Sequence, residues 1–152
     1  MPAGTRESYM QMALAEASSA AARGEVPVGA VIVSQQGDVL AAAGNRTREL
    51  ADPTAHAELL AIRAACAALG NERLGGSDIY VTLEPCAMCA AAISLARVRR
   101  LYYGIDDAKG GGVAHGARVF SQTTCHHAPE VYGGIDAARA AQLLKDFFAS
   151  RR

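Results

Sequence analysis

Hydrophobic positions along the chain switch between the spacing of a helix face and the apolar runs typical of buried strands. From about Thr5 to Ala22, Met10, Leu14 and Ala17 recur at helical spacing and predict an amphipathic helix. Further segments predict helices over about 56–69, 86–96 and 136–148. Apolar runs predict strands over about 26–33, 39–45, 79–83, 101–104 and 131–135. A turn at 35–38 joins the first two strands as a hairpin.

Local signals mark where two of these helices begin. Thr54 precedes the helix at 56–69 and could cap it, because its side-chain oxygen can accept a free backbone N–H, and Gly70 ends that helix. Pro85 opens the helix at 86–96, as a first-turn proline tends to do. His56 and Cys86 therefore lie at the starts of two different helices.

Helices and strands alternate along the chain, and no repeat, linker or low-complexity block divides it. This order predicts an α/β fold, a three-layer α/β/α sandwich around a central mixed five-stranded sheet. The 152 residues are within the usual size of one domain and can bury a core of their own. We therefore expect a single domain over 1–152.

Composition limits the kinds of partner that the chain can have. Fifteen basic residues balance fifteen acidic ones, so the chain lacks the strong overall positive field of many nucleic-acid binders. Any contact with nucleic acid is expected to be local. Three arginine clusters could make it, although each also fits a solvated surface: Arg46 with Arg48; Arg97 with Arg99 and Arg100; and Arg151 with Arg152.

The chain shows no sign of a membrane or secreted location. No apolar stretch reaches the roughly 20 residues of a membrane span. The start, Met1 to Arg6, lacks the basic end and apolar run of a secretory signal. We expect a cytoplasmic protein with reduced cysteines. Four cysteines in a reducing compartment favour metal binding or catalysis over a disulfide framework.

Two of the cysteines have the spacing of metal ligands. Cys86 and Cys89 are three residues apart at the start of a predicted helix, so their sulfurs share one face and can reach a single ion. Free N–H groups at a helix N-terminus favour the thiolate, which is the form that binds metal. Taken alone, a C-x-x-C pair is also the pattern of a redox dithiol.

His56 and Glu58 add a third ligand and a proton-transfer group. A zinc ion held by His56, Cys86 and Cys89 has three protein ligands and keeps a position open for water, which is the arrangement of a catalytic site. Glu58 is then expected to move protons and not to bind the metal. Without its neighbours, Glu58 would read as an ordinary acid in the first turn of a helix.

The joint pattern H-x-E and P-C-x-x-C resembles that of the zinc-dependent deaminases. Further segments extend this resemblance over nearly the whole chain, and with them the sequence is similar to the bacterial tRNA-specific adenosine deaminase family. The matching segments are Glu25–Val31, Gly44–Arg46, Asp52–Glu58, Tyr80–Cys86, Asp107–Lys109 and Phe147–Phe148. The resemblance implies a cytidine-deaminase-like fold.

The resemblance also implies hydrolytic deamination of adenosine to inosine at the wobble position of an arginine tRNA. Family members work as homodimers with one zinc ion per subunit. They bind the anticodon loop, whose single-stranded target base costs little to extrude. Carried over by position, Asn45 hydrogen-bonds the target nucleoside, and Val28 and Leu83 form apolar pocket walls. Asp107 and Lys109 resemble positions near the substrate nucleotides.

One segment departs from the family's commonest pattern. After Gly112, many members carry an Asn-His-Arg run, whereas this chain has Cys125, His126 and His127, which could ligate a second metal ion. Two alternatives to a tRNA deaminase stay open. One is a deaminase of a free base, nucleoside or nucleotide, such as guanine, cytosine or deoxycytidylate. The other is a structural zinc module that binds RNA without catalysis, with a fourth ligand from this segment.

Overall fold

The computed structural model describes residues 5–151, within which the helices and strands predicted from the hydrophobic pattern are all present. In chain order the elements are α1 (Arg6–Ala22), β1 (Gly29–Val33), β2 (Val39–Gly44), α2 (Ala57–Leu69), β3 (Asp78–Leu83), α3 (Ala87–Leu95), β4 (Arg100–Ile105), the 3-10 turn η1 (Val119–Ser121), β5 (Glu130–Tyr132) and α4 (Ala137–Ala149). Arg152 lies outside the described residues, so the basic pair at the C-terminus is described only in part.

The strands form one mixed sheet in the order β2-β1-β3-β4-β5. β1 pairs antiparallel with both β2 and β3, whereas β3, β4 and β5 run parallel to one another. The parallel pairing between β3 and β4 requires a crossover, which α3 supplies. The sheet confirms the mixed five-stranded arrangement that we expected from the sequence.

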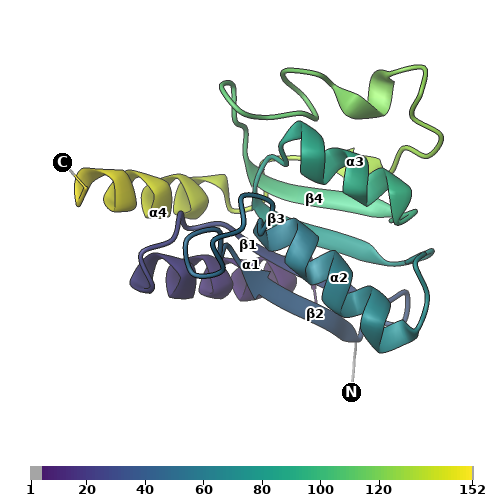
Figure 1. Ribbon diagram of the computed structural model, residues 1–152, viewed down its shortest axis with the longest axis horizontal. Coiled ribbons are helices and arrows are strands. Elements are labelled where there is room, and N and C mark those ends of the chain that lie inside the picture. Colours follow the sequence, from purple (N-terminus) through teal and green to yellow (C-terminus); the bar gives the residue numbers. More distant parts are fainter. Residues whose placement is uncertain (1–4, 152) are drawn as a thin grey trace.

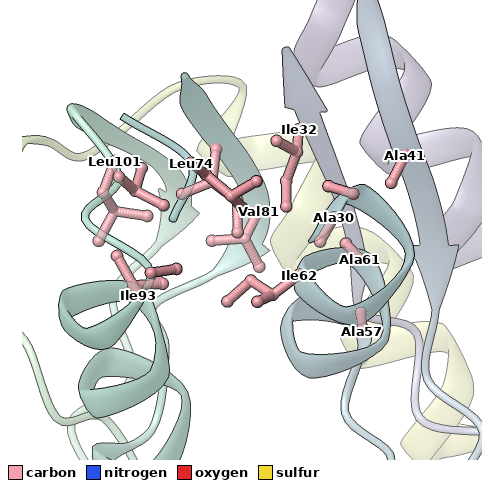
Figure 2. Close-up of a cluster of buried hydrophobic side chains, with 14 of the residues drawn as sticks. Ala30, Ile32, Ala41, Ala57, Ala61, Ile62, Leu74, Val81, Ile93 and Leu101 are labelled. Atoms are coloured by element: carbon pink, nitrogen blue, oxygen red, sulfur yellow. The ribbon is translucent and has the colours of Figure 1, made fainter. Parts of the chain in front are cut away.

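Helices cover both faces of the sheet, with α1 and α4 on one side and α2 and α3 on the other (Figure 1). β1 explains the burial on both sides, because Ala30 and Ile32 pack towards α2 and α3, while Val31 and Val33 pack towards α1 and α4. Figure 2 shows Ile62 of α2 and Ile93 of α3 among the side chains of the first of these clusters. The three layers are confirmed.

Two glycines fix α1 against the hairpin of β1 and β2. Gly29 and Gly44 are partners in the antiparallel register. A Cβ on Gly29 would collide with the carbonyl of Ala13, and one on Gly44 would lie 2.7 Å from the carbonyl oxygen of Glu16. Because neither strand position carries a side chain, the backbone of α1 can approach directly. This contact holds the end of the hairpin that bears Val28 and Asn45.

The structure moves several predicted boundaries. Thr54 does not cap α2, since its hydroxyl donates to Asp52 Oδ1 at 2.7 Å and the N-cap residue is His56. Cys86 is the N-cap of α3, so Pro85 stands one residue before the cap and not in the first turn. β1 begins at Gly29, three residues later than expected, because the backbone turns at Val26, whose carbonyl accepts from the Val28 N–H.

The helices of the described region pack in layers against the two faces of the sheet. Within residues 5–151, no helix has the length and apolar character needed to cross a membrane. α3 is buried on one side, through Cys89, Ala90, Ile93 and Ser94, whereas Leu95 at its C-terminal end is 76% exposed.

Candidate active site

Two helix N-termini bring the predicted metal ligands together. His56 is the N-cap of α2 and Cys86 is the N-cap of α3, and both have extended backbone conformations. Cys89 lies one turn further along α3 and is fully buried. The three ligand atoms all lie within 4.8 Å of one another. Among residues 5–151, this is the only group of three His, Cys, Asp or Glu side chains close enough to share an ion.

The spacing of the group fits a zinc ion. His56 Nδ1 lies 3.6 Å from Cys86 Sγ and 3.5 Å from Cys89 Sγ. A tetrahedral zinc with Zn–S of about 2.3 Å and Zn–N of about 2.0 Å separates a sulfur from a nitrogen ligand by about 3.5 Å. The donor set and its spacing therefore suit zinc, with three ligands from the protein.

The three ligands interact strongly with one another. The hydrogen bond with Cys89, together with that to His56, lowers the pKa of Cys86 to about 4. The same bond to Cys86, followed by burial, raises the pKa of Cys89. The hydrogen bond with Cys86 also raises the pKa of His56. These groups share protons, and a divalent cation bound among them would displace those protons, as metal binding at thiols does.

Glu58 points into the same site from the first turn of α2. It is only 4% exposed and it does not belong to the metal-ligand group. Burial, with the charge on Cys86 acting in the same direction, raises the pKa of Glu58 to about 7. A carboxyl group that gains and loses a proton near neutral pH suits general acid–base chemistry. An ordinary first-turn acid would be solvated, which Glu58 is not.

A cavity of about 350 Å³ opens onto these groups. It is lined by His56, Glu58 and Cys86 together with Val26, Val28, Asn45, Thr47, Leu83, Glu84, Asp107 and Gly110. Four of the five predicted substrate-binding residues are thus brought together: Val28, Asn45, Leu83 and Asp107. The volume is within the usual range of small-molecule pockets.

Asn45 contributes a polar side chain to the lining of this cavity. The residue is 7% exposed, and its backbone is fixed at both ends: its N–H donates to the Val28 carbonyl and its carbonyl accepts from Arg23. Its side-chain amide makes no hydrogen bond with any residue in the described range 5–151. No fully buried side-chain N or O among the described residues lacks a partner, so this amide is reached through the cavity and is available to a ligand there.

Lys109 lies beside this cavity and not in it. It lines a neighbouring cavity of about 710 Å³ with Phe148 and Leu144 of α4, and Leu83 and Asp107 line both cavities. The Asp107 side chain accepts from the backbone N–H groups of Lys109 and Gly110, at 3.1 and 2.9 Å, so part of its role is to shape this loop. The α4 residues were not among the predicted site residues.

A buried carboxylate that the sequence did not reveal supports one wall of the cavity. Glu25 is 1% exposed and accepts hydrogen bonds from the Thr47 hydroxyl and from the backbone N–H groups of Arg48 and Glu49. It thereby fixes the turn that follows Asn45. A single glutamate creates no pattern in the sequence that would reveal a structural role. The one signal was its place in Glu25–Val31, a segment that matches the family.

Three arginines of the clusters are engaged in ion pairs. Arg99 makes two hydrogen bonds to the Asp78 carboxylate at 3.0 and 2.9 Å, and Arg100 lies 3.1 Å from Glu130. Both arginines flank the start of β4, at the opposite end of the parallel strands from the candidate metal site. Arg46 pairs with Glu49 at 2.7 Å. The cluster at Arg97 to Arg100 is therefore poorly placed to contact a substrate in the cavity.

The segment at Cys125 to His127 does not complete the metal-ligand group. Cys125 Sγ lies 3.4 Å from Ser94 Oγ and donates to the His127 carbonyl, and His127 Nε2 lies 2.7 Å from the Val98 carbonyl. These contacts hold the loop against α3 and the segment that follows it. Among the described residues they form no second group able to hold a metal ion.

Comparisons with known proteins agree with this site. The family model of the cytidine and deoxycytidylate deaminase zinc-binding region matches residues 4–105, which include His56, Glu58, Cys86 and Cys89. A tRNA-specific adenosine deaminase of Agrobacterium fabrum is 61% identical over 147 residues, which are 97% of this chain and 96% of the relative.

Two solved structures are similar in fold and sequence. One, from work on A-to-I editing by tRNA:A34 deaminases at the wobble position of transfer RNA, is 62% identical with a TM-score of 0.90, covering 91% of this chain and 100% of its own. The other, a guanine deaminase from Bacillus subtilis, is 38% identical with a TM-score of 0.66, covering 68% of this chain and 66% of its own.

Proposed function

The chain belongs to the cytidine and deoxycytidylate deaminase family, and we propose that it hydrolyses adenosine to inosine at the wobble position of a tRNA. The observation that carries this proposal is the 61% identity to a tRNA-specific adenosine deaminase over 97% of this chain. The lining of one cavity by most of the predicted site residues of this chain supports it. We further propose that the substrate is an arginine tRNA, as the family resemblance implies, and that the enzyme works in the cytoplasm.

Different residues of the cavity have different roles in the reaction. His56, Cys86 and Cys89 would hold a zinc ion, whose Lewis acidity would lower the pKa of a water molecule to about 7. Glu58 accepts a proton from the water that adds to the amine-bearing carbon. It delivers that proton to the ring nitrogen, then accepts the second proton from the hydroxyl now on the carbon and passes it to the departing amine. Ammonia leaves, the oxygen of the water stays on the base, and Glu58 is restored.

The neighbouring residues hold and orient the base. Val28 and Leu83 enclose the apolar faces of the ring, and the unpartnered amide of Asn45 hydrogen-bonds the target nucleoside. Lys109 lines the adjacent cavity, and its ammonium group would meet the phosphates of flanking nucleotides. An anticodon loop suits such a site because its target base is already outside a duplex, which lowers the cost of extruding it.

Removing the Asn45 amide is expected to weaken the reaction without disturbing the metal. For Asn45→Ala, kcat/KM on tRNA should fall by about 10- to 100-fold, corresponding to about 1–3 kcal/mol, because the substrate loses a buried hydrogen-bond partner. Steady-state kinetics with zinc analysis measures this. Asn71→Ala is the matched control, since Asn71 is exposed and its side chain only accepts from the Arg73 N–H. Wild-type kcat/KM in Asn45→Ala would remove this residue from the proposed binding set.

We also propose that the protein is a homodimer with α3 in the interface. Leu95 is 76% exposed beside an apolar groove between α3 and the 119–126 loop, and exposed leucines bordering such a groove are typical of contact surfaces. Light scattering should give the mass of two chains for the wild type and of one chain for Leu95→Asp. Leu50→Asp, at another exposed leucine, should leave the dimer intact. A monomeric wild type would refute the proposal.

The nearest competitor is a deaminase of a free base or nucleoside, which the likeness to a guanine deaminase keeps relevant. Purified protein is incubated separately with arginine tRNA, adenosine, cytidine and guanine, and inosine in the RNA and released ammonia are measured. We expect product only from the tRNA. Turnover of a free compound with the tRNA left unchanged would assign the chain to the competing class.

A further inference from the structure

Glu84 is a buried carboxylate outside both the metal-ligand group and the proton-transfer residues. It follows the last residue of β3 and stands two residues before Cys86, and its side chain is 0% exposed. Its two carboxylate oxygens have no contact with solvent, so they need hydrogen-bond donors from the protein. A buried charge of this kind is costly unless it is well partnered.

One loop supplies all of these partners. Glu84 Oε1 accepts from the Asp107 N–H at 3.0 Å and lies 2.8 Å from His115 Nδ1. Glu84 Oε2 accepts from three consecutive backbone N–H groups, those of Val113, Ala114 and His115, at 3.1, 2.9 and 3.1 Å. Residues 107–115 are therefore folded around a single carboxylate.

Glycines let this loop lie directly against Glu84 and the start of α3. A Cβ on Gly111 would collide with Glu84 Oε2, and one on Gly112 would lie 2.5 Å from the Ala87 N. The Gly112 N–H donates to the Pro85 carbonyl at 2.8 Å. The loop thus meets the turn that carries the metal ligand Cys86 through backbone contacts alone.

The same loop forms part of the cavity wall, since Asp107 and Gly110 both line it. We propose that Glu84 is a positioning residue, which holds the 107–115 loop at a fixed place relative to Cys86 and thereby sets the affinity of the cavity for its RNA substrate. This deepens the proposed function, because it concerns how the same site holds its adenosine. Glu58 and the metal ligands are carried by the N-terminal ends of α2 and α3 and not by the loop itself.

The test replaces Glu84 by glutamine, which keeps the shape but turns one acceptor oxygen into a donor. For Glu84→Gln we expect KM for arginine tRNA to rise on the order of 10-fold while kcat changes less than about threefold, the pattern of lost substrate binding. Zinc content should equal that of the wild type. Backbone amides at 107–115 should exchange faster with deuterated solvent, because their shared acceptor is weakened.

Gly111→Ala reaches the same contact from the loop side and keeps the proposal testable if Glu84→Gln does not fold. It leaves the charge in place, yet its Cβ displaces the loop from Glu84, so the same rise in KM and the same faster exchange are expected. Gly75→Ala is its control, because a Cβ there meets nothing within 4 Å. Glu130→Gln controls for loss of a carboxylate from the same sheet at an exposed position.

Three results would overturn the proposal. They are an unchanged KM with unchanged exchange at 107–115, a fall in kcat without a rise in KM, and loss of zinc from Glu84→Gln. Failure of the proposed function is seen separately, because the wild type would then leave tRNA unmodified. The exchange measurement needs no turnover and still reports whether Glu84 holds the loop.

Discussion

Glutamine in place of Glu58 is expected to slow deamination of tRNA by about 10²- to 10⁴-fold, the usual contribution of a positioned acid–base group. The substitution keeps the volume of the side chain in a site where Glu58 is 4% exposed, so packing should survive. Glutamine cannot take a proton from water or return one to the base. Inosine formation in single-turnover assays measures the effect, and zinc analysis should find the metal retained.

The matched control for Glu58→Gln is Glu7→Gln. Glu7 is an acid in the first turn of α1, so it has the same place in its helix but is exposed. If Glu58 were only stabilising a helix N-terminus, the two variants would behave alike, with full activity and a small loss of stability. Full activity in Glu58→Gln would therefore contradict the assigned role.

Serine in place of Cys89 is expected to remove zinc and, with it, all measurable deamination. A serine hydroxyl is a far poorer zinc ligand than a thiolate, and Cys89 is the buried cysteine of the three-ligand group. Because zinc binds the folded protein, its loss should also lower the thermal midpoint. Zinc content per chain, activity and thermal unfolding are measured on the same preparation.

Two other cysteines provide controls for the metal experiment. Cys66 and Cys125 are free thiols outside the three-ligand group. Cys125→Ser should retain zinc, whereas a structural site closed by that cysteine would lose it. Cys66→Ser should retain zinc as well. Zinc bound at the wild-type level in Cys89→Ser would contradict the ligand assignment, and zinc lost from Cys125→Ser would favour the structural module.

The order of elements was predictable because each one carries a local signal. The burial of β1 on both faces follows from a short run of small and β-branched residues, and the sheet and its two helix layers followed from the order of such runs. Boundaries were less predictable. Thr54 looked like a helix cap, but Asp52, two residues earlier, takes its hydroxyl, and no sequence rule decides between these two local hydrogen bonds.

The metal-ligand group was predictable because its residues are few, specific in type and spaced along helix starts. The buried carboxylates that support the cavity walls were not predictable. Glu84 collects partners from residues 23 to 31 positions away, and Glu25 does the same for the turn after Asn45. Such contacts depend on tertiary packing, so neither carboxylate has a periodic signal. The ion pairs of Arg99 and Arg100 were not predictable either, because their acidic partners, Asp78 and Glu130, are distant in sequence.

The most direct test of the proposed function locates inosine within the RNA. Wild-type protein with zinc is incubated with an arginine tRNA that carries adenosine at the wobble position, and the product is sequenced to find where adenosine has become inosine. We predict inosine at the wobble position alone, released with one ammonia per tRNA, and none with Glu58→Gln. An unmodified tRNA, or inosine at other positions with the wobble adenosine intact, would contradict it.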